Sequence, residues 1–452
     1  MTDQGPQSGQ AEPAEARRPA PVHGGRDALL RGEDAPEVGG PEPALDPKGN
    51  PLPSRPGQRF SVLPSTGEIV DPVREYRREA YRLREASRRL LDYAEFRGLH
   101  QCGLPVTGEG GSVRVVVHPV SGRAHWSGVL HCGSPWVCPV CARKISARRG
   151  EDIEGAVAEW LAGGGQVFFA TLTVPHLRRY ALEWLLEGFS RARRRLWSHR
   201  RWREWKFRHI VPGVISAFEI TYGLNGWHPH LHVLIFVAGD PATPEDLHEV
   251  LWSIWSDAVL AAGLGEASPE ALHVVEVGPR EAGAIAAYTA GGSGKHWGIG
   301  AEMAGQVVKR GGLSPFELLA VAAGRRVLDW LPQERAVALW REYARATRGR
   351  RHLVWSPGLA EVLGLRSVSD EELANAEGDG EEVLKISARD YAVLRRLGYL
   401  AEPLELVEDY GPEVALTWIR QVVGGRSPPD PAAKSSERDF ADSDAFLRAA
   451  WG

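Results

Sequence analysis

Hydrophobic residues gather in four short stretches between residues 166 and 277 of the chain. The stretches are rich in β-branched and aromatic residues and are bounded by Gly, Pro or Asn, a pattern that predicts strands. They are Gln166–Val174, Gly213–Tyr222, His230–Val237 and Leu272–Val277. Only Gly223–Pro229 separates the second stretch from the third, a length that suits an antiparallel hairpin.

Helical spacing of apolar residues is found before, between and after these strands. Asp71–His100 is Arg-rich and carries apolar or aromatic residues at intervals typical of an amphipathic helix. Further helices are expected at about 178–205, about 244–262, Pro315–Ala323, Leu328–Arg345 and Glu413–Val423. Antiparallel strands with intervening helices predict an α+β fold, in which helices flank a central antiparallel sheet.

Charge is distributed unevenly along the chain, although the net formal charge is only -4. Residues 178–208 contain eleven Arg or Lys against three Glu, with tryptophans between them. We expect the arginines to bind DNA phosphates, while the tryptophans pack on the sheet rather than stack on bases. The arginines expected at DNA are Arg191, Arg193, Arg194, Arg195, Arg200 and Arg201. A smaller basic cluster at 341–351 is a second candidate for DNA contact.

The C-terminal part has the opposite charge. Residues 370–444 contain eighteen acids and eight bases. Because such a segment repels DNA, we expect it to fold separately, to bind a partner or to limit non-specific DNA binding. No apolar run reaches the 18–20 residues that span a bilayer, and the N-terminus lacks a signal pattern. We therefore expect a cytoplasmic protein without a membrane partner.

The four cysteines of the chain all fall within forty residues. Cys138 and Cys141 form a C-x2-C pair, which binds one ion between two thiolates, and Cys132 and Cys102 complete a four-coordinate shell. Four soft ligands favour a structural Zn²⁺. His125 or His131 is the alternative to Cys102 as the fourth ligand, and disulfides or unrelated buried thiols are the alternatives to a metal site.

Three histidines, His228, His230 and His232, occur within five residues where the third strand is expected to begin. Residues two apart in a strand face the same side, so His230 and His232 present parallel imidazoles while Leu231 faces the core. Two neutral imidazoles are a ready pair of metal ligands, and Glu219 on the preceding strand supplies a carboxylate. A single histidine is more often structural, but three so close together favour a metal or catalytic site.

Three motifs resemble the ordered motifs of HUH endonucleases. They are FATLTVPH at Phe169–His176, GWHPHLHVLIF at Gly226–Phe236 and AAYTAGG at Ala286–Gly292. More narrowly, the chain is similar to the replication initiators of rolling-circle plasmids, particularly actinobacterial ones. The CGSPWVCPVCARKIS run, GLSPFELLA at Gly312–Ala320 and LVWSPGL at Leu353–Leu359 resemble the same group, so the resemblance extends from Cys102 to Leu365.

The resemblance implies a chemistry and its residues. A tyrosine, by position Tyr288, would attack a phosphodiester of single-stranded or hairpin origin DNA and form a 5′-phosphotyrosine. Mg²⁺ or Mn²⁺ would be held by His230, His232 and Glu219, with His228 beside them. The family's lysine three residues after the tyrosine is absent here, so either Lys295 replaces it or that cation is missing.

The function expected on this basis is initiation of rolling-circle plasmid replication, with a host helicase as a further partner. A single-tyrosine transposase or relaxase would keep the chemistry, whereas a non-enzymatic zinc DNA-binding protein or a metal hydrolase of small molecules would not.

The expected domain division follows composition and motifs. It is a disordered Pro/Gly-rich tail at 1–70, a helix with the zinc module at 71–150, the nicking domain at 151–325, a helical extension at 326–365 and an acidic helical region with a flexible end at 366–452.

Overall fold

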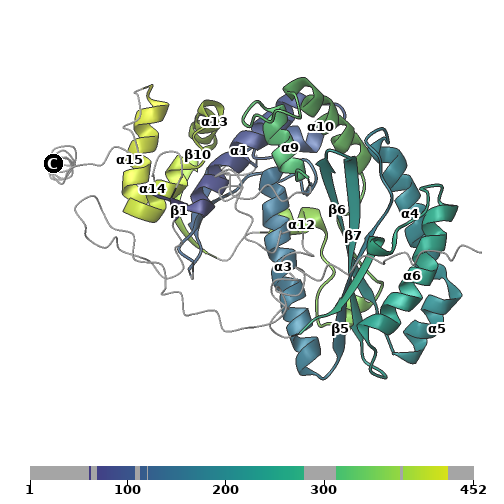
Figure 1. Ribbon diagram of the computed structural model, residues 1–452. Helices are drawn as coiled ribbons and strands as arrows, with labels where there is room; N and C mark the ends of the chain where they lie inside the picture. The colour runs from purple at the N-terminus through teal and green to yellow at the C-terminus, as the bar shows by residue number, and fades with distance from the viewer. Residues whose placement is uncertain are drawn as a thin grey trace, which may run out of the picture. The chain divides into compact units, whose positions relative to one another are not determined.

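Five antiparallel strands form the central sheet, in the order β8-β5-β7-β6-β9 (Figure 1). The strands are β5 (Gln166–Thr173), β6 (Val214–Gly223), β7 (Gly226–Val237), β8 (Leu272–Glu276) and β9 (Leu353–Trp355). The four predicted strands are β5 to β8, and helices cover the sheet. The prediction of an α+β fold with a central antiparallel sheet is confirmed.

The computed structural model describes residues 61–62, 69–106, 112–119, 121–278, 312–376 and 380–425. All of them belong to the unit Gly57–Gly452. Its other strands are β1 (Ser61–Val62), β2 (Ile69–Val70), β3 (Ser112–Val117), β4 (Ala124–Ser127) and β10 (Glu381–Ser387). Its helices are α1 (Pro72–Leu90), α2 (Arg97–Gln101), α3 (Pro139–Ala162), α4 (Leu182–Ser198), α5 (Arg200–Arg208), α6 (Pro244–Ala261), η2 (Pro269–Ala271), α9 (Pro315–Ala322), α10 (Gln333–Thr347), α11 (Leu359–Val362), α12 (Asp370–Asn375), α13 (Ala388–Leu397), α14 (Glu402–Tyr410) and α15 (Pro412–Val423).

The hairpin between β6 and β7 is tighter than predicted. Gly223 pairs with Gly226, so only two residues form the turn and β7 begins four residues earlier than expected. Gly226 has φ +91°, and a Cβ there would lie 2.7 Å from the Cα of Arg178. A glycine is therefore required at this position, and the histidines that follow lie inside the strand.

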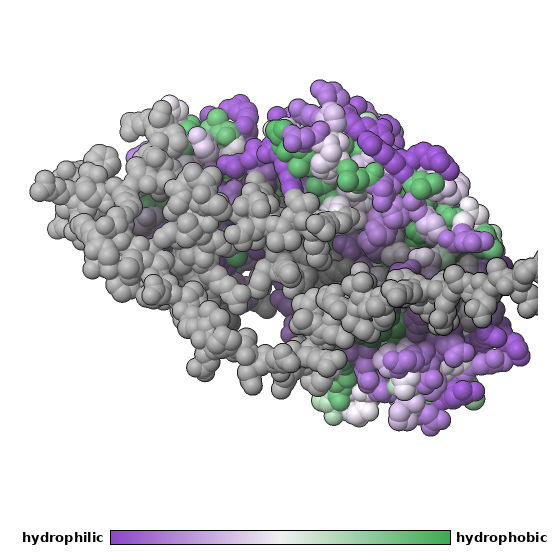
Figure 2. Space-filling view, viewed as in Figure 1, coloured by the Kyte–Doolittle hydropathy of each residue, from purple (hydrophilic) through white to green (hydrophobic). Residues whose placement is uncertain are grey.

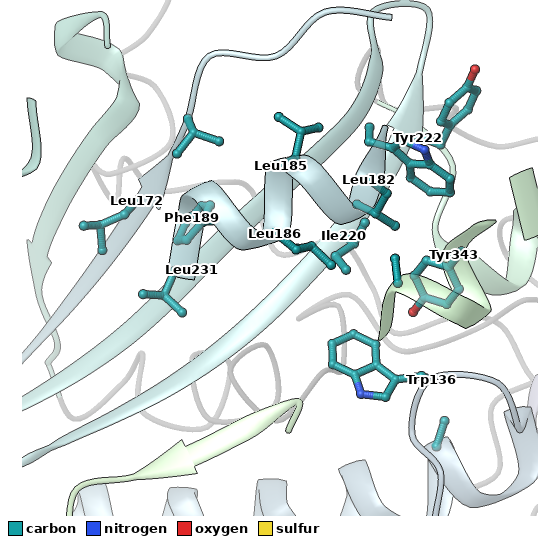
Figure 3. Close-up of a cluster of buried hydrophobic side chains, with 14 of the residues drawn as sticks. Trp136, Leu172, Leu182, Leu185, Leu186, Phe189, Ile220, Tyr222, Leu231 and Tyr343 are labelled. Atoms are coloured by element: carbon teal, nitrogen blue, oxygen red, sulfur yellow. The ribbon is translucent and has the colours of Figure 1, made fainter. Parts of the chain in front are cut away.

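The two faces of the sheet pack against different helices. Leu182, Leu185, Leu186 and Phe189 of α4 meet Leu231 and neighbouring residues on one face, as Figure 3 shows. The other face, with Leu234 and Phe236 of β7, packs against α3 and α11. Alternate residues of β7 thus enter two separate cores.

The tryptophans of the basic stretch follow the packing expectation. Trp202 and Trp205 are buried, and Trp197 packs at the edge of the same core. The charged residues of α5 face outward, and the surface over this helix is largely hydrophilic (Figure 2). Exposed cations therefore surround a buried aromatic layer.

A second sheet joins two regions that are far apart in the sequence. Its strand order is β10-β3-β4, and α13, α14 and α15 pack on it around a separate core. β10 belongs to the acidic C-terminal part, whereas β3 and β4 lie beside the cysteines. The expected domain limits stay a prediction, but these two regions share one sheet.

The acidic helix α14 faces the arginines of α1. Asp409 accepts two hydrogen bonds of 2.7 Å from Arg74, and Glu408 accepts one of 2.6 Å from Arg77. Glu405 pairs with Arg78 in the same way. Many of the C-terminal acids that were expected to repel DNA are thus neutralised within the chain.

None of the described helices is both long and apolar enough to cross a membrane.

Candidate functional site

Two clusters of metal-ligand residues are brought together by the fold. The first consists of the four cysteines. Cys102 follows α2, Cys132 lies in the loop after β4, and Cys138 and Cys141 lie at the N-terminus of α3. Cys102 and α3 are distant in sequence, so packing of α1 and α2 against α3 creates the cluster.

The four sulfur atoms of this cluster all lie within 4.8 Å of one another. Cys102 Sγ is 3.7 Å from Cys138 Sγ and 3.6 Å from Cys141 Sγ. A tetrahedral zinc site with Zn–S bonds of about 2.3 Å has sulfur–sulfur edges of roughly 3.8 Å. The spacing therefore suits a four-thiolate metal site. His131 lies next to it, with Nδ1 3.9 Å from Cys141 Sγ, and is not needed to complete four ligands.

Arginines of α1 support the cysteine cluster. Burial alone would lower the pKa of Arg84, but attraction to the Cys102 thiolate outweighs burial and the pKa is raised. Arg88 donates hydrogen bonds to the carbonyl groups of Leu99 and Cys102, which fixes the loop that carries this ligand. Two guanidinium groups thus offset the negative charge that four thiolates bring to a buried site.

Neighbouring thiols affect the protonation of the cluster. Hydrogen bonds from Cys132 and the other thiols lower the pKa of Cys102, whereas burial raises the pKa of Cys138. Without a metal, one thiolate is therefore shared among thiols. Metal binding must release the remaining protons, which makes the affinity depend on pH.

Helix α12 holds the loop that carries Cys132. The backbone N–H of His131 donates to Asn375 Oδ1 at 3.0 Å, and Asn375 Nδ2 donates to the His131 carbonyl oxygen at 3.2 Å. Gly133 has φ +64°, and a Cβ there would lie 2.7 Å from the Cα of Glu371. The backbone of α12 can approach this closely only because residue 133 is a glycine.

The second cluster is a row of imidazoles on the central sheet. In the strand pairing, His232 lies opposite Thr171 and Ala217, and His230 lies opposite Thr173 and Glu219. His228, His230 and His232 share the face of β7 that also carries Leu234 and Phe236. This face is opposite to the one that packs on α4.

Ring contacts connect the members of this row. The His230 and His232 rings are nearly parallel, at 15° with centroids 5.9 Å apart, and His228 lies 3.9 Å from His230. The His176 ring stacks on His228 at 4.2 Å. Phe169 stacks on His232 at 5.5 Å and 9°. We refer to His176, His228, His230 and His232 as the imidazole row.

Hydrogen bonds fix the orientation of His232. Its Nε2 lies 2.9 Å from Glu219 Oε2, and its Nδ1 lies 3.2 Å from Thr171 Oγ1. By contrast, the buried Nδ1 of His230 has no hydrogen-bond partner among the described residues. A buried nitrogen without a partner beside a carboxylate and a second imidazole suits a metal ligand.

Burial keeps these imidazoles neutral. It lowers the pKa of His228 to about 3, with repulsion from His230 and His176 as smaller causes. It also lowers the pKa of His230 to about 4, although Glu219 opposes the shift. Both rings therefore keep their lone pairs for a metal ion at neutral pH.

Sequence reasoning did not identify His176, Thr171 or Phe169 as parts of this cluster. All three belong to FATLTVPH, which drew attention as a motif without roles for its members. The alternation of residues along β5 places Phe169 and Thr171 on one face. His176 lies beyond the end of β5 and reaches His228 only through the tertiary fold.

The expected DNA-binding arginines lie on α4 and α5, which cover the sheet face opposite to the imidazole row. Arg193 lies over the Phe218 ring at 5.4 Å, and Arg191 donates to the Ala262 carbonyl oxygen at 3.0 Å. Arg200 pairs with Glu204 at 3.1 Å. Arg194, Arg195 and Arg201 are exposed. Their role at DNA remains a prediction.

Two expected site residues, Tyr288 and Lys295, lie outside the described residues. The smaller basic cluster takes part in tertiary contacts, since Arg341 donates to the Leu90 carbonyl oxygen and Arg345 to Glu95. The structure thus brings together the cysteines and, separately, the histidines with Glu219.

Known proteins share both regions of the chain. Residues 126–244, which include Cys132 and the imidazole row, match the family described as "Replication protein". "Protein rep" of Streptomyces lividans is 29% identical over 336 residues, which cover 60% of this chain and 72% of that protein. A "Neomycin resistance protein" of Streptomyces cyanogenus is 28% identical over 150 residues, which cover 28% of this chain and 34% of that protein.

No solved structure gives a significant match. The matches include a replication protein from the actinobacterial genus Streptomyces, and they cover the segments in which the motifs were found. The resemblance of this chain to the replication proteins of rolling-circle plasmids is therefore confirmed.

Proposed function

We propose that this protein initiates rolling-circle plasmid replication by nicking one strand of the origin and rejoining strands after synthesis. The observation that carries the proposal is the imidazole row, in which His230 and His232 lie beside Glu219 on adjacent antiparallel strands. The similarity to replication proteins supports the same biological role. Origin DNA is the proposed substrate, and a host helicase is a further proposed partner in the cytoplasm.

A divalent ion fits the residues of this site. His230, His232 and Glu219 would hold Mg²⁺ or Mn²⁺, and the unpartnered Nδ1 of His230 supports this assignment. His228 adds a fourth neutral imidazole edge to the site. When bound, the ion would neutralise the scissile phosphate and orient it for in-line attack.

Tyr288 is the proposed nucleophile, and the chain connectivity supports its approach. The Val277 N–H donates to the Val167 carbonyl oxygen, at the end of the sheet far from the hairpin. Leu313 pairs with Tyr222 beside the hairpin. These two anchors are separated by roughly nine residues of strand, or about 30 Å. The chain that joins them includes Tyr288, and the imidazole row lies between the anchors.

The proposed step is a transesterification. The phenol oxygen of Tyr288 forms a bond to phosphorus while the bond from phosphorus to the 3′-oxygen breaks. The phenol loses its proton, and the 3′-oxygen gains one to become the hydroxyl that primes synthesis. A phenol with an ordinary pKa near 10 is a weak nucleophile at neutral pH, so it depends on the charge and orientation supplied at the site.

Covalent capture tests this proposal. The full chain is mixed with labelled single-stranded DNA of the plasmid origin and Mn²⁺, and mass spectrometry identifies the residue that carries the oligonucleotide. We expect the adduct on Tyr288 and its loss in Tyr288→Phe. An adduct on another residue would refute the assignment of the nucleophile.

Other outcomes separate the alternative functions. DNA binding without any adduct would indicate a non-enzymatic zinc DNA-binding protein. Hydrolysis of small molecules that survives Tyr288→Phe would indicate a metal hydrolase. A transposase or relaxase would form the same adduct but on DNA other than a plasmid replication origin.

We also propose that the cysteine cluster binds a structural Zn²⁺. Its four thiolates leave no position for a reactive water, so the ion would stabilise the fold rather than take part in nicking. Metal analysis of the purified chain tests this, and one zinc per chain that is lost in Cys138→Ser is the expected result.

A further inference from the structure

A cavity of about 460 Å³ lies between α1, α3 and the β3–β4 hairpin, apart from both ligand clusters. The volume is in the range of pockets that bind small ligands or parts of larger ones. Six cationic residues line it, together with three histidines and a single carboxylate, Glu151. The cations are Arg77, Arg84, Arg123, Arg143, Lys144 and Arg148.

Some of these cations are neutralised from behind the wall of the cavity. Arg77 pairs with Glu408 at 2.6 Å, and Arg123 pairs with Asp71 at 2.8 Å. Neither carboxylate lines the cavity. Arg84 is turned toward the cysteine cluster, as its raised pKa indicates. These three residues therefore contribute little uncompensated charge.

The cations on α3 are different. Arg143 and Arg148 form no ion pair with any described residue. Arg143 is exposed and lies 4.4 Å from the Tyr76 ring centroid, and Arg148 is half-buried. They lie five residues apart, with Lys144 between them, along the face of α3 that lines the cavity. This face presents positive charge that no carboxylate of the described chain balances.

Hydrogen-bond donors in the wall also lack acceptors. Tyr76 Oη, Arg77 Nη1 and Arg84 Nε are buried without a partner among the described residues. Tyr76 and Arg84 are each only 1% exposed. Buried donors without acceptors are costly, so several of them around one cationic cavity favour an anionic ligand.

The protonation of His125 reports the same electrostatic environment. This residue lines the cavity, and its pKa is lowered to about 4. Burial is the largest cause, and repulsion from Lys144, His118 and Arg77 adds to it.

We propose that this cavity binds a phosphate group through Arg143 and Arg148. The phosphate comes either from the backbone of the bound DNA, which rests on the function proposed above, or from a free nucleotide or pyrophosphate. Exposed guanidinium groups suit both sources because they donate paired hydrogen bonds to phosphate oxygens.

The test uses Arg143→Gln/Arg148→Gln in the full chain, with Arg396→Gln as control. Arg396 is exposed on α13 and does not line the cavity. All proteins also carry Tyr288→Phe and are measured without Mg²⁺ or Mn²⁺, so that nicking plays no part. Binding of a labelled single-stranded oligonucleotide is followed by fluorescence anisotropy over a range of salt concentrations.

For a DNA phosphate, the slope of log affinity against log salt should fall by about 0.7 for each contact removed. The control should keep the slope of the parent. Calorimetric titration with pyrophosphate is the second arm. Loss of pyrophosphate binding in the double variant, with an unchanged DNA slope, would assign the cavity to a free phosphate.

An unchanged DNA slope together with unchanged or absent pyrophosphate binding would overturn the proposal. The melting temperature of each variant is measured alongside, because both substitutions lie at accessible positions and should leave it close to that of the parent. Since nicking is blocked throughout, this result is independent of whether Tyr288 is the nucleophile.

Discussion

The cysteine cluster and the imidazole row are both sets of metal-ligand residues, but they differ in how closely their atoms converge. The four sulfur atoms lie within 4.8 Å of one another, and among the described residues no set of His and acidic side chains reaches that closeness. The His230 and His232 centroids are 5.9 Å apart, in a row that extends to His176. A closed shell suits a structural ion, whereas an open row leaves room for a substrate phosphate.

Their surroundings differ in the same sense. The cysteine cluster is enclosed by Arg84 and Arg88, which offset negative charge. The imidazole row lies beside a carboxylate, Glu219, that is still 39% exposed at its side chain. The comparison predicts that damage to the first cluster affects folding and that damage to the second affects chemistry.

The largest effect is expected for Cys138→Ser. Loss of one buried ligand should release the zinc and destabilise the protein by on the order of 4 kcal/mol or more. Thermal unfolding with metal analysis measures this. Ala162→Ser, at the exposed end of the same helix, is the matched control and should melt like the parent. A Cys138→Ser protein that retains zinc and melts normally would contradict the structural role.

The next effect is expected for His230→Ala and His232→Ala. Metal-assisted charge stabilisation contributes several kcal/mol, so adduct formation should fall by about 10³-fold. Origin binding should largely remain, because phosphate contacts dominate affinity. His273→Ala is the control, since His273 is exposed on β8 opposite Thr171 in the same sheet.

If His230→Ala or His232→Ala lost DNA binding and thermal stability together with cleavage, the histidines would be structural and the comparison would fail.

A smaller effect is expected for Glu219→Gln, which keeps the shape of the side chain and removes its charge. Ligand and supporting groups of this kind affect metal affinity or activity by about 10- to 100-fold. The variant should need more Mn²⁺ for half-maximal adduct formation, while zinc content and melting temperature stay unchanged. An unaltered Mn²⁺ requirement would remove Glu219 from the metal site.

The smallest effect concerns pH. The folded-state pKa of His230 is lowered to about 4, so below about pH 6.5 the unfolded chain takes up a proton that the folded chain does not. This residue therefore lowers the free energy of unfolding as the pH falls from about 6.5 to 4. NMR titration of the imidazole checks the shift, and a midpoint near 6.5 in the folded protein would contradict the burial.

Much of the architecture could be predicted because it depends on local patterns. The strands of the central sheet were recognisable from β-branched and aromatic runs, and the shared face of His230 and His232 from the two-residue repeat of a strand. The C-x2-C pair indicated a metal site from spacing alone. Such features depend on residues close together in the chain.

Other features arise from contacts between distant segments. The pairing of β10 with β3 escaped prediction because neither strand carries information about its partner. The ion pairs between α1 and α14 likewise changed the interpretation of the acidic region, since charge counts along the chain cannot show which carboxylates face arginines.

The sequence by itself determined which chemical groups are present, and in strands and helices it determined which of them share a face. Only the tertiary structure decided that Cys102 joins the three later cysteines, that His176 stacks on His228 and that Glu219 reaches His232. The physical reason is that local sequence sets the direction of each side chain, whereas distances between elements follow from how their apolar faces pack.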